Sequence, residues 1–421
     1  PGPFYEHPKP VPAGKIVRIF FLHPNFPAQF RNLAAALGQK KHQVYFLTAN
    51  KRPEWEIPGV SKVLFSKIDF SGLVGTRFIA AAAEQGKEAF KALMGLKAQG
   101  IIPDLICAHS GWGCGLFVRD VFPETPFLGY FEWYYAPDGL DACFDSGQRP
   151  GSSKCAELRC KNLTIEQDLL HCDAGLSPTK WQKSQFPKAF QGKINCLHEG
   201  IDTSFFCPGQ AKKSELKGLE GAEKIITYAA RGLEPTRGFP QFMSAMQKVL
   251  HEIPGAHAVI MGSDRVPYGT PPQKHSTYRE QMLAELDLDL ERIHFTGPLP
   301  YGKYREMLRL SDVHVYLTRP FVLSWSLLEA MACGCLIVGS NTPPVREVLE
   351  DGVNGLLTDF NDAHAIGSRI ADALYFPSFM QPIRHKARQT IEQKYALQTV
   401  LPRQLELINR LALKKGPGPF G

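Results

Sequence analysis

Short apolar segments that alternate with helical segments constrain the fold of this chain more than any other feature. Residues 15–22 form a nearly continuous apolar run before the turn residues that follow, which is typical of a buried parallel strand. Residues 29–37 carry apolar side chains at positions 30, 33, 34 and 37, which is a helical spacing, and residues 43–47 form a second apolar run. Strand, helix and strand in this order indicate a βαβ unit.

The same alternation continues through the first half of the chain. Residues 77–97 have the pattern of a long helix, and further strands are expected at 105–108, 126–131, 174–177 and 194–197. Residues 15–207 therefore predict one doubly wound α/β domain, an N-terminal Rossmann-like domain.

The pattern breaks at residues 208–223, which are rich in Lys, Gly and Glu and are interpreted as a linker. A second series starts at residue 224, with strands expected at 224–229, 256–261, 293–296, 313–317, 336–339 and 355–357. We expect a C-terminal Rossmann-like domain over 224–385, and a helix over 386–413 that returns to the first domain. Ligands of such sheets bind at the carboxyl ends of the strands, which here predicts a cleft between two facing domains.

Composition narrows the class of protein. The 421 residues are 44% hydrophobic and 21% charged, which excludes a disordered chain, a collagen and a coiled coil. No apolar run reaches the length of a transmembrane helix, and the N-terminal residues lack the apolar core of a signal peptide. The net charge of +7 fits an anionic ligand or an acidic membrane surface better than nucleic acid.

The ten cysteines have irregular spacing and no CxxC pair, so we interpret them as reduced thiols in a cytosol. The expected location is cytoplasmic, with contact to the inner face of an acidic membrane as an open alternative. The tetrapeptide Pro-Gly-Pro-Phe occurs at 1–4 and again at 417–420, and the sequence does not decide whether these tails are native.

Two segments of the second domain carry candidate chemistry. Residues 316–334 run from a strand through Ser324, Trp325 and Ser326 into a helix-forming segment that contains Glu329. A helix start at the carboxyl edge of a sheet suits a phosphate group, although Ser326 and Glu329 also fit a capping box. In the other segment, Arg231 and Arg237 flank a Gly/Pro turn, where both can face one anion or remain solvated surface residues.

Taken together, these segments resemble family 4 glycosyltransferases with the GT-B fold (glycosyl transferases group 1). The resemblance covers residues 16–405 and rests on motifs in family order: 177–182, 198–203 with Phe206 and Pro208, Arg231 with Arg237 and Gly238, 295–297, and 328–334.

The resemblance implies roles for residues of the second domain. Arg231 matches the first member of the basic pair that binds the donor diphosphate, and Arg237 stands where the family usually has Lys. Glu329 matches the second glutamate of the E-x7-E pair, which holds the nucleotide ribose. Phe321 occupies the first glutamate's position and so removes a polar contact near the donor sugar. Further donor-side positions implied by the resemblance are Ser324, Trp325 and Ser326 at the phosphates and Gly262, Ser263 and Leu299 around the base.

In the first domain, the resemblance places a loop after the first strand near the diphosphate and the acceptor. Here that loop is Asn25, Phe26, Pro27 and Ala28, without the family's glycine. Glu132 stands after a later strand where the family often has a histidine that contacts the transferred sugar, and His109 is a second candidate. A Glu132 paired with an arginine, and a His109 satisfied by backbone at a strand end, are the structural alternatives.

We expect neither a metal nor a cofactor. Asp287 and Asp289 look like a DxD metal motif, but they precede a strand instead of following one, and no other carboxylate cluster appears. The resemblance implies a retaining glycosyltransferase that moves a sugar from a nucleotide sugar to a hydroxyl of a glycan, lipid or small molecule. A sugar-nucleotide 2-epimerase of the same fold and a non-catalytic nucleotide-sugar-binding protein remain the alternatives.

Overall fold

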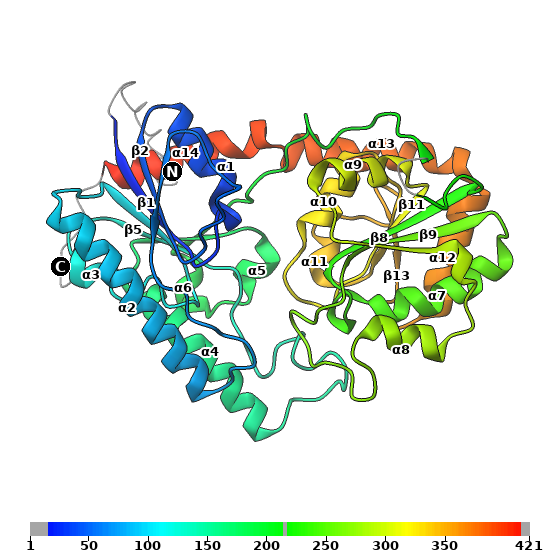
Figure 1. Ribbon diagram of the computed structural model, residues 1–421, viewed down its shortest axis with the longest axis horizontal. Coiled ribbons are helices and arrows are strands. Elements are labelled where there is room, and N and C mark those ends of the chain that lie inside the picture. The colour runs from blue at the N-terminus through cyan, green and yellow to red at the C-terminus, as the bar shows by residue number, and fades with distance from the viewer. Residues whose placement is uncertain (1–15, 214–216, 414–421) are drawn as a thin grey trace, which may run out of the picture. The chain divides into compact units, whose positions relative to one another are not determined.

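The computed structural model describes residues 16–213 and 217–413. Both Pro-Gly-Pro-Phe tails and part of the predicted linker lie outside the described residues. The chain forms two compact units (Figure 1). Among the described residues, unit 1 contains 16–199 and 400–413, and unit 2 contains 200–213 and 217–399.

The sheet of unit 1 has seven strands in the order β3-β2-β1-β4-β5-β6-β7, and every neighbouring pair is parallel. Its strands are β1 (Arg18–Leu22), β2 (Gln43–Thr48), β3 (Val60–Leu64), β4 (Leu105–His109), β5 (Phe127–Tyr130), β6 (Ala174–Ser177) and β7 (Ile194–Cys196). Its helices are η1 (Ala28–Phe30), α1 (Arg31–Gln39), α2 (Thr76–Ala98), α3 (Val118–Val121), α4 (Ser152–His171), α5 (Lys180–Ser184) and α6 (Lys188–Gln191).

Helices cover both faces of this sheet, which explains why its strands are apolar on both faces. Phe20 of β1 packs with residues of α2, α3 and α4, whereas the next residue, Phe21, packs with α1. The last helix among the described residues, α14 (Leu397–Ala412), adds Leu407 and Ile408 to the cluster around Phe21.

The sheet of unit 2 has six parallel strands in the order β10-β9-β8-β11-β12-β13. Its strands are β8 (Lys224–Gly232), β9 (Ala256–Ser263), β10 (Ile293–Gly297), β11 (Val313–Tyr316), β12 (Ile337–Ser340) and β13 (Leu356–Thr358). Its helices are η3 (Pro235–Arg237), α7 (Phe239–Glu252), α8 (Tyr278–Glu285), η4 (Leu290–Arg292), α9 (Tyr301–Leu310), α10 (Trp325–Ala332), α11 (Pro343–Arg346), α12 (Ala363–Tyr375) and α13 (Pro377–Lys394).

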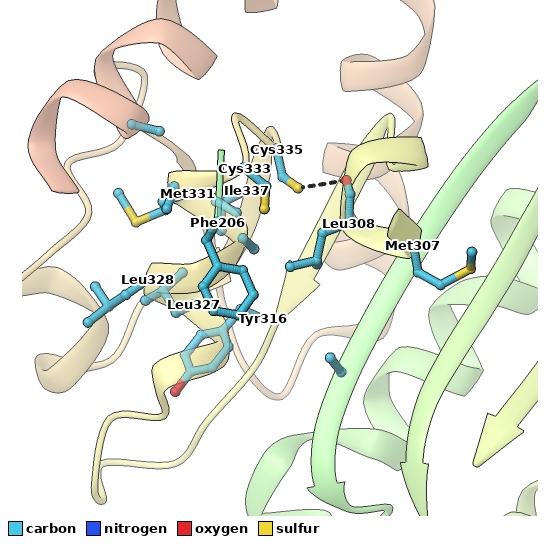
Figure 2. Close-up of a cluster of buried hydrophobic side chains, with 14 of the residues drawn as sticks. Phe206, Met307, Leu308, Tyr316, Leu327, Leu328, Met331, Cys333, Cys335 and Ile337 are labelled. Carbon is cyan, nitrogen blue, oxygen red and sulfur yellow. Dashed lines mark hydrogen bonds between the residues drawn. The ribbon is translucent and has the colours of Figure 1, made fainter. Parts of the chain in front are cut away.

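Helix α10 is buried against this sheet along most of its length. Figure 2 shows Leu327, Leu328 and Met331 in a cluster with strand and α9 side chains, where the Cys335 thiol donates to the Leu308 carbonyl at 3.1 Å. Because core packing fixes α10, the residues at its beginning have a defined position at the carboxyl edge of the sheet.

The predicted fold of two Rossmann-like domains is confirmed, but three elements differ from the prediction. The single helix predicted over 386–413 is wrong, because the chain forms two helices there, α13 and α14, which are separated by Tyr395 and Ala396. Strand β3 is absent from the predicted set because its sequence, VSKVL, lies at the edge of the sheet and none of its residues is fully buried, so it forms no continuous apolar run. Strand β8 extends to Gly232, three residues beyond the predicted end, so Arg231 belongs to the strand and not to the loop that follows.

Candidate functional site

Arg231 lies near the carboxyl end of β8 and has an exposed side chain. Its backbone carbonyl accepts hydrogen bonds from Ser263 Oγ at 2.8 Å and from Arg265 Nε at 3.4 Å. Within the described residues, no hydrogen bond or ion pair involves the guanidinium itself. Arg231 is therefore a fixed strand residue whose charge is available to an anionic ligand.

Arg237, predicted to be the partner of Arg231, lies in a different environment. It ends η3 and is only 7% exposed. Its Nη1 donates to Thr318 Oγ1 at 2.8 Å and to the Val322 carbonyl at 2.9 Å. These bonds tie Arg237 to the segment between β11 and α10, so part of its hydrogen-bonding capacity serves the structure of unit 2.

The loop after β9 packs over this arginine. The guanidinium of Arg237 lies 5.4 Å from the ring centroid of Tyr268. The rings of Tyr268 and Phe321 pack edge to face, with their centroids 5.2 Å apart. The Tyr268 amide donates to Glu234 Oε2 at 3.0 Å, and burial raises the pKa of Glu234. Phe321, at the family's glutamate position, thus forms an aromatic contact in unit 2.

The N-cap of α10 is Ser324, whereas the capping-box alternative requires Ser326 at this position. The Ser324 Oγ accepts from the Ser326 amide at 3.3 Å. The two hydroxyls lie 3.0 Å apart, and the Ser324 amide donates to the Tyr316 hydroxyl at 2.8 Å. Trp325, the first helical residue, is half-buried against the core.

The remaining donor-side candidates also lie in unit 2. Glu329 is buried on α10. Burial of Tyr304 and the charge of the nearby Glu329 raise the pKa of Tyr304. Leu299 follows β10 and packs against the same core cluster as α10. Gly262 has φ 154°, and a Cβ there would lie 2.2 Å from the Ala230 carbonyl oxygen, so only glycine allows β8 and β9 to approach this closely.

In unit 1, His109 ends β4 and is buried against Tyr130 and His23, whose ring centroids lie 5.2 and 4.6 Å from its own. The Nδ1 atom bonds to the Ser110 carbonyl at 2.8 Å and therefore carries the proton. Burial lowers the pKa of His109, although Glu132 opposes this shift. The backbone thus satisfies one ring nitrogen, as the structural alternative required, and Nε2 has no hydrogen-bond partner in the described part of the chain.

Glu132 follows β5 and lies beside this histidine. Its Oε2 is 3.8 Å from His109 Nε2, and its Oε1 accepts from Gln29 Nε2 at 3.0 Å. The structural alternative, a pair with arginine, is not found among the described residues. An unprotonated imidazole nitrogen beside a partly exposed carboxylate can accept hydrogen bonds from ligand hydroxyls.

The loop after β1 is held mostly by buried aromatic packing. Phe26 packs edge to face on Phe46 at 4.9 Å, and Pro27 is buried as well. Asn25 is exposed, and its amide donates to His23 Nδ1 at 2.8 Å, while Ala28 is half-buried at the start of η1. Of the four predicted residues, Asn25 therefore has the most accessible side chain.

Sequence reasoning assigned no role to Glu199, which lies close to His109 and Tyr130. The Tyr130 hydroxyl donates to Glu199 Oε1, and His198 Nε2 lies 3.4 Å from Oε2. Burial and the charge of Glu199 raise the pKa of Tyr130. The signal available in the sequence was the adjacent His-Glu pair of the 198–203 motif, which we used only to recognise the family.

A second buried acid, Asp168, packs against the loop that follows β4. It is 1% exposed on α4, and neither carboxyl oxygen has a hydrogen-bond partner among the residues the structure describes. A Cβ on Gly115 would lie 2.4 Å from its Oδ1, so the carboxyl group packs directly against this loop. Burial raises the pKa of Asp168 to about 7, and the nearby Ser110 hydroxyl offsets part of the shift.

Replacing Asp168 with asparagine should stabilise the protein at high pH only. The pKa near 7 in the folded state exceeds the usual 3.8, so the acid lowers folding stability progressively as pH rises through this interval. We expect Asp168→Asn to raise the free energy of unfolding by about 2–4 kcal/mol at pH 8 and to leave it unchanged at pH 3.5. Urea unfolding at both pH values tests this, and an equal effect at both would contradict it.

The residues of two motifs that we do not assign to function, the Asp287–Asp289 pair and an Asn-Leu-Thr glycosylation sequon at 162–164, include Asp289 and Asn162, which have structural partners. Asp289 caps η4 and pairs with Arg292 at 2.7 Å, and within residues 16–213 and 217–413 no group of three or more His, Cys, Asp or Glu side chains is placed to hold a metal ion. Asn162, in a glycosylation sequon, is buried with its amide bonded to the Tyr135 backbone. In the same part of the chain, no helix has both the length and the apolar composition needed to cross a bilayer.

Known families match both halves of the chain. Residues 40–206 match the glycosyl transferase family 4 group, and residues 210–392 match the glycosyl transferases group 1. The chain is 24% identical over 293 residues to D-inositol 3-phosphate glycosyltransferase of Corynebacterium jeikeium, which covers 66% of each protein. It is 26% identical over 238 residues to spore coat protein SA of Bacillus subtilis, covering 54% of this chain and 61% of that protein. The chain thus spans about half to two thirds of the length of such relatives.

Solved structures share the fold over nearly the whole chain. Anabaena HepE in complex with UDP-glucose has a TM-score of 0.71 at 15% identity, covering 94% of this chain and all of that one. Sucrose-phosphate synthase of Thermosynechococcus elongatus has a TM-score of 0.72 at 17% identity, covering 94% and 99%. Two parallel sheets with this topology, each half matched by a family, establish that the chain belongs to the family 4, group 1 glycosyltransferases of GT-B fold.

Proposed function

We propose that this protein transfers a sugar from a nucleoside-diphosphate sugar to an acceptor hydroxyl, with retention of configuration at the anomeric carbon. The observation that carries the proposal is the exposed guanidinium of Arg231 at the carboxyl end of a central parallel strand, which no described residue engages in a hydrogen bond or ion pair. Strand β11, the neighbour of β8, leads into the capped start of α10, so a cation and a positive helix end share one sheet edge. The curated relatives include several named glycosyltransferases, which agrees with this activity.

In this proposal the donor binds unit 2. Arg231 and the start of α10 stabilise the negative charge that develops on the leaving diphosphate, and Glu329 binds the ribose. The β-phosphate accepts the proton of the attacking hydroxyl, so the reaction needs neither a metal nor a cofactor.

In unit 1, His109 Nε2 and Glu132 bind sugar hydroxyls of the reacting groups. The acceptor that we propose is a glycan or a lipid-linked hydroxyl. Contact with an acidic membrane fits the net charge of +7.

Binding of nucleoside diphosphates should be measurable as thermal stabilisation. A ligand that binds only the folded protein at 100 times its Kd adds about 2.7 kcal/mol to stability. We expect one of UDP, GDP, ADP and TDP to raise the melting temperature in proportion to the logarithm of its concentration, and the corresponding nucleoside to raise it far less. If none of the four diphosphates shifted the melting temperature, the donor class would be wrong.

An activity assay separates the proposed transferase from the alternatives. With the matching nucleotide sugar, a transferase releases the nucleoside diphosphate only when an acceptor is present. An epimerase changes the sugar without an acceptor, and a binding protein does neither. The anomeric configuration of the product, read by NMR, tests retention.

A further inference from the structure

We propose that Arg265 is the second cation of the diphosphate site, beside Arg231, in the place that the family resemblance gave to Arg237. This inference rests on the proposed function, because it assigns a further residue to the same donor site. The two predicted arginines differ in burial, since Arg231 is exposed and Arg237 is not. Arg237 is buried and bonded to Thr318 and Val322, so its charge is partly committed within unit 2.

Arg265 has the environment that Arg237 lacks. It is exposed in the loop after β9, and its Nε lies 3.4 Å from the Arg231 carbonyl oxygen. In the described residues this bond to the Arg231 carbonyl is its one hydrogen bond, and no carboxylate forms an ion pair with it. Burial, followed by the positive charge of Arg231, lowers the pKa of Arg265.

The loop holds Arg265 in this place by close packing. A Cβ on Gly232 would lie 2.5 Å from the Arg265 carbonyl and 2.4 Å from Pro267 Cδ, so the loop crosses directly over the end of β8. The Ser263 hydroxyl donates to the Arg231 carbonyl at 2.8 Å, which joins the end of β9 to the same strand. Arg231 and Arg265 are therefore both attached to one rigid sheet edge.

The far end of the loop is fixed as well. The Tyr268 amide donates to the buried Glu234 carboxylate, and the Tyr268 ring packs against Phe321. Tyr268 in turn covers Arg237. The loop is thus anchored on both sides of Arg265, and the buried arginine contributes to this anchoring.

Arg231 and Arg265 are adjacent cations, and neither forms an ion pair with a carboxylate of residues 16–213 or 217–413, so they repel each other in the free protein. A dianion that bridges them removes this repulsion and gains charge-assisted hydrogen bonds from both. The group that fits two guanidiniums attached to neighbouring strand ends is a diphosphate, because each phosphate can take one of them. Arg237 then acts as a positioning residue that holds the β11–α10 segment and the Tyr268 ring.

The test compares Arg265→Gln with a matched control, Arg369→Gln, in the full chain. Arg369 is an exposed arginine of unit 2 that pairs with Asp351 at 3.1 Å, so its loss removes the same charge elsewhere. Isothermal titration calorimetry with inorganic pyrophosphate and with UDP, GDP, ADP and TDP measures the Kd of each variant. We expect Arg265→Gln to weaken pyrophosphate binding, and that of the preferred nucleotide, by about 10- to 100-fold. The control should change both by less than about twofold.

The outcomes separate this inference from the proposed function. If the wild type binds a nucleoside diphosphate and Arg265→Gln binds it equally well, the inference is wrong and the function stands. If pyrophosphate binds in an Arg265-dependent manner but no nucleoside diphosphate binds, the anion site stands and the donor assignment fails. If the wild type binds neither probe, both are rejected. Equal losses in Arg265→Gln and Arg369→Gln would show an effect of net charge alone and also overturn the inference.

Discussion

Replacing Arg231 with alanine is expected to lower kcat/KM for sugar transfer by about 100- to 1000-fold, the cost of removing one preorganised group that stabilises developing charge. The guanidinium is exposed, and no described residue forms a hydrogen bond or ion pair with it, so the substitution breaks no such bond among the described residues. Stability should therefore stay within about 0.5 kcal/mol of the wild type. Steady-state transfer assays and urea unfolding measure the two quantities.

Two variants sharpen this test. Arg231→Lys keeps the charge but loses bidentate geometry, and should recover part of the activity. Arg369→Gln removes an exposed arginine from the same unit and should leave activity unchanged. An Arg231→Ala protein with full activity would rule out Arg231 as a donor-phosphate residue.

Replacing Arg237 with alanine is expected to act mainly on stability. The substitution leaves the Thr318 hydroxyl and the Val322 carbonyl without this donor, and it removes a positive charge that lowers the pKa of the buried Glu234. Breaking one side of a buried charged network costs about 3–5 kcal/mol. Urea unfolding should show a lower midpoint with an unchanged slope.

Arg231→Ala is the matched control, since it removes the same side chain six residues earlier in the chain. Arg237→Lys keeps the charge and should recover part of the lost stability. If Arg237→Ala unfolds like the wild type but fails to transfer sugar, Arg237 contacts the donor directly and its contacts to Thr318 and Val322 contribute little.

Much of the fold could be predicted from the sequence because parallel strands that are buried on both faces of a sheet have nearly continuous apolar sequences. The central strands β1, β4, β8 and β11 were predicted close to their observed positions. Edge strand β3 was not, because none of its residues is fully buried and its sequence has no continuous apolar run. The end of β8 was also missed, since Arg231 and Gly232 are not apolar. The strand regains its pairing with β9 only at Gly232, opposite Ser263, after an irregularity in the register.

The positions of the candidate site residues could be predicted, but their burial and their contacts could not. Sequence motifs named Arg231, Arg237, Phe321 and Glu329, and nothing in their spacing distinguishes an exposed arginine from a buried one. The roles of Glu199 and Arg265 could not be read from the sequence for a similar reason. Each meets its neighbours only when strand ends far apart in the chain come together.

The sequence by itself determined two Rossmann-like domains, the family, and the sheet edge where we propose the donor site. It could do so because periodicity and motifs are local properties of a chain. Only the tertiary structure decided that Arg237 is buried with Thr318, and that Arg265 lies beside Arg231. The physical reason is that charge exposure and desolvation depend on packing between distant segments, and a loop that crosses a strand at Gly232 leaves no repeating pattern in the sequence.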